Sequence, residues 1–407
     1  MVIYKFMSVW LLIYGVFLSV AICQGNQIPN AEVSSGVKYE WIGRWDQAKL
    51  NTILKTETPT FAGVTVDYTP ATNAVQLYRV TYPSVVPERD NKPIVATGLL
   101  AIPETANSKN LPLVSYQHGT VYDKYQVPSF PEKSPETALM IAQFAGQGYI
   151  VIGADYFGMG ESAEPEGYMV KASHQQASYD MLMASQVVLN HMQITSQQLF
   201  LAGWSQGGFV TMAFLEKLER SQIEVKGVAT ASAPTDIFMT LNGFLSFPRA
   251  IDADWVPTLF ILSAFSFERY YGIPGLARSV INDAYYDVSR DAYERRPFNP
   301  SDIPTDLKKL IRSEYFDPQY FAASAYGKLI SETHAYRWVV KSAVRNYYGE
   351  NDEAISVGLG RLPMTYQQAM GGGNDKVQAI STGNSTHRGT FAKAVPRWKA
   401  FFDGADH

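Results

Sequence analysis

Apolar positions follow two different periods along the chain, and the two periods alternate from about residue 111 onward. Short apolar runs bounded by turn residues are typical of buried strands, whereas apolar residues three and four positions apart are typical of helices packed on a sheet. Strands are predicted at 78–82, 94–102, 111–116, 149–154, 198–202, 225–231, 344–348 and 377–380, and helices at 136–147, 172–191, 208–218 and 390–402. No element is predicted between 24 and 77. This order predicts an α/β fold with a mostly parallel central sheet and helices on both faces.

The alternation stops between 236 and 336, in a segment rich in aromatic residues and short helical patterns. We interpret this segment as a helical cap inserted between two strands of the sheet, so that 24–235 and 337–407 together form the body of the fold. A core within the cap itself accounts for most of its apolar residues. Its apolar run at 255–262 is too short to cross a membrane.

The N-terminus has the form of a secretory signal peptide, predicted over 1–23. Lys5 precedes an apolar run at 9–22, and Ala21 and Cys23 are small residues at the two positions that a signal peptidase reads. The protein is therefore expected to be secreted, to the extracellular space or the periplasm, and not to stay inserted in a membrane. Two alternatives stay open: a retained membrane anchor, for which the run is short, and a lipid on Cys23. Because Cys23 is the only cysteine, disulfides do not stabilise the mature chain.

Composition and charge narrow the classes of partner. A net charge of −4 provides no basic surface for nucleic acid or for an anionic membrane. No Cys/His spacing of the zinc type and no glycine-rich phosphate loop is present, so neither a metal nor a nucleotide cofactor is expected. A hydrophobic content of 46% with 18% charged residues indicates a globular rather than a disordered chain.

Candidate chemistry lies at Gly-Trp-Ser-Gln-Gly, residues 203–207, between a predicted strand and a predicted helix. A tight turn of this kind holds its central residue in a strained conformation, and Gly203 and Gly207 allow the backbone segments to approach closely. The hydroxyl of Ser205 then projects into a cleft at the start of a helix. Because the motif alone is also compatible with a glycine-rich turn, the rest of the chain must supply a base, an acid and oxyanion donors.

A serine hydroxyl needs an imidazole to take its proton, and the imidazole needs a carboxylate to orient it. In folds with such a turn the chain order is serine, acid, histidine. His387 lies after the last predicted strand, in a loop where the base is expected, although a solvated loop histidine is the alternative. For the acid, Asp352 is favoured over Glu350 and Glu353, any of which could instead point to solvent, whereas Asp375 precedes the last strand at the wrong edge of the sheet.

Backbone amides are the expected donors to the oxyanion. The Gln206 amide begins the helix after the serine, and Gly119 lets the chain turn so that the Thr120 amide faces the site. His118 is expected to hold this loop by hydrogen bonds rather than to act as a base. The side chains expected to contact a substrate are Trp204, Phe244 and Phe260.

Together these motifs resemble the α/β-hydrolase superfamily. The resemblance is carried by His118-Gly119, by 155–162 and 203–207, and by Asp352 and His387. Within the superfamily, Gln-His-Gly-Thr at 117–120, Gly-Tyr-Ile-Val-Ile-Gly-Ala-Asp-Tyr-Phe-Gly-Met-Gly at 148–160 and Gly-Trp-Ser-Gln-Gly-Gly at 203–208 are similar to secreted lipases and esterases of the secretory lipase family. The similarity runs from about residue 111 to the C-terminus, apart from the cap.

This resemblance implies Ser205 as nucleophile, His387 as base, Asp352 as its orienter, and an acyl-enzyme intermediate. Trp204 replaces the more frequent His or Tyr, and Arg388 follows the base, so the preferred substrate stays open. We therefore expect a secreted serine esterase or lipase that acts on a small-molecule ester or a lipid without a cofactor.

Three other functions stay open at this point. A serine peptidase of the same fold could bind a substrate amine through Glu268, Asp283 or Asp287. Acyl transfer to another alcohol would use the same three catalytic residues. A non-catalytic binding protein that kept the fold is disfavoured, because the serine, the acid and the histidine are all present in the expected order.

Overall fold

The computed structural model describes residues 31–34, 36–107, 109–371 and 376–405. The predicted signal peptide, with Cys23, lies outside these residues, and so does Asp375. Within them the strands form one ten-stranded sheet in the order β1-β2-β3-β4-β6-β5-β7-β8-β9-β10. The strands are β1 (Ala31–Ser34), β2 (Val37–Trp45), β3 (Val75–Val86), β4 (Lys92–Pro103), β5 (Leu111–Gln117), β6 (Ile150–Ala154), β7 (Ser196–Trp204), β8 (Gly227–Ala231), β9 (Val344–Tyr348) and β10 (Val377–Ser381).

The half of the sheet that carries the sequence motifs is parallel. Strands β6, β5, β7, β8, β9 and β10 run parallel, whereas β1 to β4 and the β4–β6 pair are antiparallel. β6 and β8 are buried along their whole length, as expected of parallel strands covered by helices on both faces. The predicted α/β fold with a mainly parallel sheet is confirmed.

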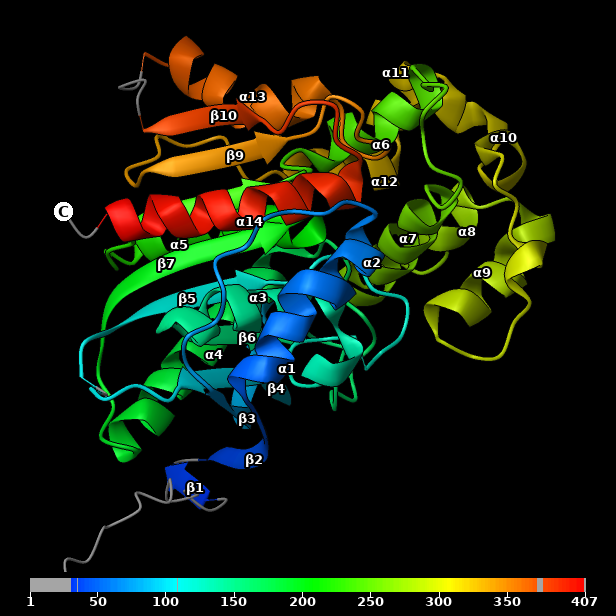
Figure 1. Ribbon diagram of the computed structural model, residues 1–407. Coiled ribbons are helices and arrows are strands. Elements are labelled where there is room, and N and C mark those ends of the chain that lie inside the picture. The colour runs from blue at the N-terminus through cyan, green and yellow to red at the C-terminus, as the bar shows by residue number, and fades with distance from the viewer. Residues whose placement is uncertain (1–30, 35, 108, 372–375, 406–407) are drawn as a thin grey trace, which may run out of the picture.

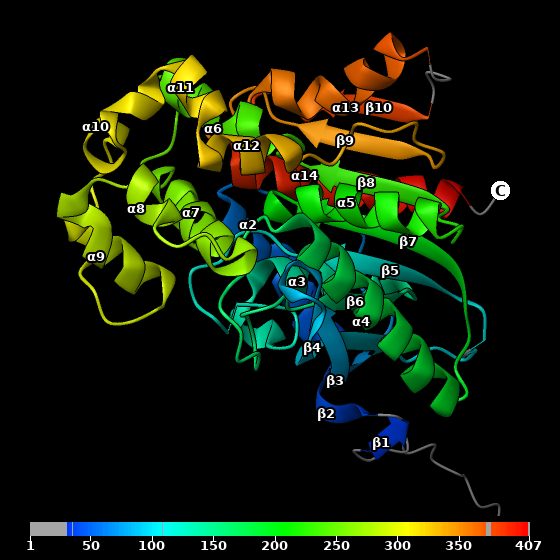
Figure 2. The same cartoon turned by 180° about the vertical axis from the view of Figure 1, so that it is seen from behind.

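Helices cover both faces of the sheet (Figure 1 and Figure 2). On one face lie α4 (Lys171–His191), α5 (Gln206–Arg220) and α13 (Val357–Ala369), and on the other lie α1 (Gln47–Thr52), α2 (Thr58–Ala62), α3 (Pro135–Gln143) and α14 (His387–Gly404). Each face has its own apolar core. Phe209 and Phe214 of α5 belong to the first, and Phe144 and Trp398 belong to the second.

The segment between β8 and β9 is helical and lies beyond the ends of the parallel strands (Figure 1). Its helices are α6 (Ile237–Ser246), α7 (Pro257–Tyr271), α8 (Leu276–Val280), α9 (Asp283–Tyr293), α10 (Leu307–Leu310), α11 (Pro318–Ala323) and α12 (Ala325–Glu332). Its two ends meet, because Asp236 pairs with His334 in an isolated bridge and accepts a hydrogen bond from Arg337 at 2.9 Å. We call this helical segment the cap.

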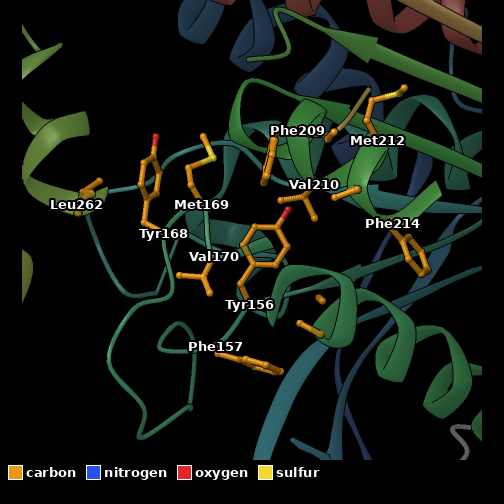
Figure 3. Packing of buried hydrophobic residues seen from close by; sticks show 14 of the residues in the cluster. Tyr156, Phe157, Tyr168, Met169, Val170, Phe209, Val210, Met212, Phe214 and Leu262 are labelled. Atoms are coloured by element: carbon orange, nitrogen blue, oxygen red, sulfur yellow. The ribbon is translucent and has the colours of Figure 1, made fainter. Parts of the chain in front are cut away.

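Apolar packing joins the cap to the body. Figure 3 shows Tyr168 and Met169, from the loop before α4, between Leu262 of the cap and Phe209 of α5, and all four belong to one apolar cluster. Among the described residues, no helix combines the length and the apolar character needed to cross a membrane.

The structure differs from the prediction mainly at the N-terminal end. Strand β2 and helices α1 and α2 occupy residues for which no element was predicted. In β2, buried Val37 and Tyr39 alternate with exposed Lys38 and Glu40. The predicted link at 83–93 is also shorter, because β3 extends to Val86, with a single 3-10 turn before β4. Pro83 is tolerated in β3 because it lies beyond the residues that pair with β2.

Candidate active site

Ser205 lies in the turn between β7 and α5, in a backbone conformation that residues with a side chain rarely adopt. Its φ is 57° and its ψ is −124°. The turn closes only because its neighbours lack a side chain. A Cβ on Gly203 would lie 2.3 Å from the carbonyl oxygen of Gly207, and a Cβ on Gly207 would lie 1.9 Å from the carbonyl oxygen of Gln117. The motif therefore forms a strained turn with the serine at the start of a helix.

The structure brings Ser205, His387 and Asp352 together, although each follows a different strand. Nε2 of His387 lies 2.9 Å from Oγ of Ser205, and Nδ1 lies 3.0 Å and 3.1 Å from the two carboxylate oxygens of Asp352. Ser205 follows β7, Asp352 follows β9 and His387 follows β10. These strands are parallel, and parallel strands end at one edge of a sheet. His387 is the first residue of α14, which corrects its predicted place in a loop. The helix begins early because the Thr386 side chain caps it.

Asp352 is buried, and its oxygens have several donors. Oδ1 accepts the N–H groups of Ala354 at 2.9 Å and Ile355 at 2.8 Å, and Oδ2 accepts the Ser232 hydroxyl at 2.6 Å. Burial alone would raise the pKa of Asp352, but the charge and hydrogen bond of His387, with the Ser232 and Ile355 donors, hold the pKa below its ordinary value. A carboxylate at Nδ1 favours the tautomer whose Nε2 accepts a proton from serine. Sequence reasoning missed Ser232, because only the pairing of β8 with β9 brings it here.

Glu353 and Trp204 fix the start of α14. The backbone N–H of His387 donates to Oε2 of Glu353 at 2.8 Å, and the Trp204 indole N–H donates to the His387 carbonyl at 3.2 Å. Glu353, considered above as an alternative acid, instead places its carboxylate at a helix N-terminus, where negative charge is favourable. Trp204 is 6% exposed; its ring stacks on Phe391 and its centroid lies 5.0 Å from that of the His387 ring.

The two amides expected to bind an oxyanion belong to Gln206, which begins α5, and to Thr120, which lines the cleft with Ser205. Within the described chain, neither the Gln206 amide nor the Thr120 amide donates to an acceptor. The loop before Thr120 is held by His118, whose ring nitrogens lie 2.8 Å from the Gly119 carbonyl oxygen and 3.2 Å from that of Asp155. Burial lowers the pKa of His118 to about 4, so its ring is neutral at pH 7.

Glu136, a buried acid that sequence reasoning missed, supports the same loop from behind. Its Oε2 accepts the Tyr116 hydroxyl at 2.6 Å and the Gly119 N–H at 2.8 Å. Burial raises the pKa of Glu136 to about 7. In the sequence it follows Ser134 and Pro135 at the start of a helix, where an exposed glutamate is common, so no signal marks it as buried.

Two cavities meet at Ser205. The first, which we call the chamber, has about 410 Å³ of empty space and lies under the cap; it is lined by Tyr168, Met169, Ser205, Pro234, Ile237, Thr240, Leu241, Trp255, Leu259, Ser263, Ala354 and Ile355. The second, which we call the cleft, has about 860 Å³ and is more open; it is lined by Thr120, Tyr122, Trp204, Ser205, Trp255, Glu353, His387 and Arg388. They share Ser205 and Trp255. The chamber contains no charged side chain, whereas the cleft contains a glutamate, an arginine and the histidine.

The three residues expected to contact substrate lie in different places. Trp204 forms part of the cleft. Phe260 is fully buried within the cap and lines neither the chamber nor the cleft, whereas Leu259 and Ser263 of α7 line the chamber. Phe244 does not reach the chamber either. It lies one turn farther along α6 than Leu241 and lines two outer cavities of the cap. Periodicity identified these aromatic residues as buried but not which cavity each one faces.

The residues proposed for an aminopeptidase are engaged elsewhere. Glu268 accepts the Ala277 N–H at 2.8 Å, Asp283 pairs with Arg278 at 2.8 Å, and Asp287 pairs with Arg290 at 3.0 Å. None of the three acids lines the chamber or the cleft. Among the described residues, no cluster of three or more His, Cys, Asp or Glu side chains could hold a metal ion.

Comparison with known proteins supports the same fold. A family profile described as serine aminopeptidase, S33, matches residues 127–268, a stretch that contains Ser205 but neither Asp352 nor His387. No curated protein matches the sequence. The profile therefore covers the strained turn and most of α7 but not the acid and the base.

Similar structures cover nearly the whole chain. The Legionella pneumophila protein lpg1103, for which hydrolase activity is proposed, is 20% identical with a TM-score of 0.79, over 92% of this chain and 99% of that one. The rice cell wall degrading esterase LipA from Xanthomonas oryzae is 19% identical with a TM-score of 0.75, over 93% and 97%. Candida antarctica lipase A is 14% identical with a TM-score of 0.58, over 85% and 77%. The resemblance to the α/β-hydrolase superfamily is confirmed at the level of the fold.

Proposed function

We propose that this protein of the α/β-hydrolase fold is a serine carboxylic-ester hydrolase. The observation that carries the proposal is the continuous hydrogen-bonded set of Ser205, His387 and Asp352 at the mouth of an uncharged chamber. The esterase and lipase among its structural neighbours agree with ester chemistry. Their low identity carries over no substrate, so the proposal rests on the site itself.

In the proposed reaction, Oγ of Ser205 attacks the ester carbonyl while Nε2 of His387 takes the hydroxyl proton. The negative charge that develops on the carbonyl oxygen is bound by the Gln206 and Thr120 amides. Asp352 stabilises the imidazolium. The tetrahedral intermediate then collapses, the bond to the alcohol oxygen breaks, and His387 protonates the leaving alcohol. Water attacks the acyl-enzyme by the same steps and releases the carboxylic acid.

We infer from the position of His387 which half of the ester each cavity binds. The leaving alcohol oxygen must lie within hydrogen-bond reach of the imidazole that protonates it. His387 lines the cleft but not the chamber. The alcohol therefore lies in the cleft, and the acyl group lies in the chamber on the other side of Ser205.

A second candidate, an aminopeptidase, is favoured only by the description of the family profile. The free amine of an aminopeptidase substrate lies on the acyl side of the scissile bond, and a buried ammonium group needs a carboxylate partner. The chamber has no acidic residue. Comparing turnover of aminoacyl-naphthylamides with that of acyl esters decides between the two, and faster turnover of the naphthylamides would support the peptidase.

The direct test of the proposal is the Ser205→Ala variant. We expect its turnover of p-nitrophenyl butyrate to fall about 10⁴-fold or more, because the nucleophile is removed while the oxyanion donors stay. Ser331→Ala on α12 is the matched control and should keep wild-type turnover. A Ser205→Ala enzyme with near wild-type turnover would contradict the proposal.

Export is also proposed, from the sequence of residues 1–23 alone. N-terminal sequencing of the protein from the culture medium or the periplasm should give Gln24 as the first residue. A mature chain that keeps residues 1–23 would contradict cleavage.

A further inference from the structure

Two small side chains of the chamber also line a second cavity. Thr240 of α6 and Ala354, which follows Asp352, line the chamber. The same two residues also line an outer cavity of about 760 Å³, which we call the groove; its other lining residues are Met239, Gly243, Phe244, Phe247, Arg249, Asp252, Ser356, Gly358 and Leu359. Thr240 and Ala354 thus form the wall between the chamber and the groove.

The groove has a surface suited to an alkyl chain. Met239 is 49% exposed and Phe247 is 75% exposed, and they are among the most exposed large apolar residues of the described chain. Both lie on or at the end of α6, the helix that also supplies Ile237, Thr240 and Leu241 to the chamber. Apolar residues of α6 therefore line both the chamber and the groove, and Thr240 lines both cavities.

The size of the chamber limits the acyl group that it can hold. Its empty space of about 410 Å³ is about half that of the cleft, and Thr240 and Ala354 bound it on the side of the groove. A wall at this position limits how many methylenes of an acyl chain the chamber can take.

We propose that the wall of Thr240 and Ala354 determines the acyl-chain length that the enzyme accepts. In the wild-type protein the wall restricts the chamber to short and medium acyl groups. Opening the wall connects the chamber to the groove, where the distal methylenes of a long acyl chain lie against Met239 and Phe247. This inference rests on the proposed ester hydrolysis and on the placement of the acyl group in the chamber.

The test is the chain-length profile of Thr240→Ala, measured as kcat/KM for p-nitrophenyl esters from acetate to palmitate. The wild type should be most active between butyrate and octanoate and at least tenfold less active on palmitate. The variant should raise the ratio of palmitate to butyrate turnover at least fivefold, and a circular dichroism spectrum and a thermal unfolding curve like those of the wild type show that it is folded.

Thr240→Val is the matched control. The Thr240 hydroxyl donates to the Asp236 carbonyl at 2.7 Å, and valine removes this bond but keeps the shape of the wall, so the profile should not change. Adding Met239→Ala to Thr240→Ala should reduce the gain on palmitate without affecting butyrate. A wild-type preference for palmitate, or an unchanged profile in Thr240→Ala, would overturn the inference.

These outcomes are separate from the test of the proposed function. If Ser205→Ala abolishes ester turnover but Thr240→Ala leaves the profile unchanged, the wall assignment is wrong and the ester hydrolase stands. If Ser205→Ala keeps its turnover, the proposed function itself is wrong.

Discussion

The chamber and the cleft begin at the same serine but differ in almost every physical property. The chamber is smaller, lies under the cap and contains no charged side chain. The cleft is larger and more open, and it contains Glu353 and Arg388 beside His387. Trp255 lines both, as Ser205 does. One side of the site can therefore bind only apolar groups well, while the other can accept polar or charged groups.

This difference follows from which elements form each wall. The chamber is enclosed by α6 and α7 of the cap, whose inward faces are apolar because they share the core of the molecule. The cleft is formed by residues that follow strands, together with the first residues of α14, where polar groups cap a helix. In the proposed reaction the cap therefore binds the acyl group, and the catalytic residues lie at the edge of the sheet.

The largest effect is expected from Asp352→Asn, which acts through His387 on Ser205, where the two cavities meet. An amide at this position cannot favour the His387 tautomer that accepts the serine proton. We expect kcat for p-nitrophenyl butyrate to fall about 10⁴-fold at pH 7 with little change in KM. Retention of more than about a tenth of wild-type kcat would show that Asp352 does not orient the histidine.

A polar side chain introduced into the chamber should reduce the difference in polarity between the two cavities. In Leu241→Asn a polar amide replaces an apolar side chain of the chamber, so we expect the free energy of unfolding to fall by roughly 3 to 4 kcal/mol and kcat/KM for the butyrate ester to fall about tenfold. Leu245→Asn, one turn along the same helix and outside the chamber, is the control. It should lose similar stability without a change in KM. Equal kinetic effects in both variants would count against the chamber as the acyl site.

The buried Glu136, which supports the loop before Thr120, should make the stability of the protein depend on pH. The pKa of Glu136 rises in the folded protein from 4.5 to about 7, so the folded state keeps a proton that the unfolded state loses. The stabilisation that comes from this proton is therefore fully present below pH 4.5, and it is lost as the pH rises to about 7. Glu136→Gln lacks this loss, and its unfolding free energy relative to wild type should increase by about 3 kcal/mol at most across that range.

Denaturant unfolding of Glu136→Gln and wild type at pH 4 and pH 8 measures this difference. Glu132→Gln, on an exposed side chain just before α3, is the control and should show a difference below about 1 kcal/mol at either pH. If the unfolding free energy of Glu136→Gln relative to wild type instead decreased with rising pH, the pKa of Glu136 would not be raised in the folded protein.

The smallest effect is expected from Arg388→Ala in the cleft. Arg388 is exposed, and no carboxylate in the described chain lies within ion-pair distance of it; its guanidinium lies 4.8 Å from the centre of the Phe61 ring. Removing it should lower kcat/KM up to about fivefold for esters whose alcohol is anionic, and only at low salt. Neutral esters should change less than twofold, as should both classes in Arg397→Ala farther along α14. Equal loss for both classes would indicate a structural role.

Much of the site could be predicted from the sequence because its chemistry depends on chain order and local turns. The strained turn at Ser205 needs Gly203 and Gly207 next to it, so a short motif indicates it. His387 and Asp352 follow apolar strands, and the parallel sheet brings such positions to one edge.

The remaining parts depend on contacts between segments far apart in the sequence. Ser232 reaches Asp352 only through the pairing of β8 with β9, and Glu136 reaches Gly119 through the packing of α3 behind β5. For Phe260, helical periodicity indicates burial, but the direction depends on how α7 packs against the body. The alternation in β2 covers only residues 37–40, because a register shift between Trp41 and Gly43 interrupts it, and so short a pattern is a weak signal for a strand.

The most direct test of the account is to locate the covalent intermediate. The wild-type protein is treated with a fluorophosphonate, and the adduct is mapped by mass spectrometry of its peptides. We predict one adduct per chain, on Ser205, whose formation is slowed by octanoate esters that fill the chamber. A folded protein that hydrolyses esters but carries no adduct, or carries it on another residue, would contradict the account.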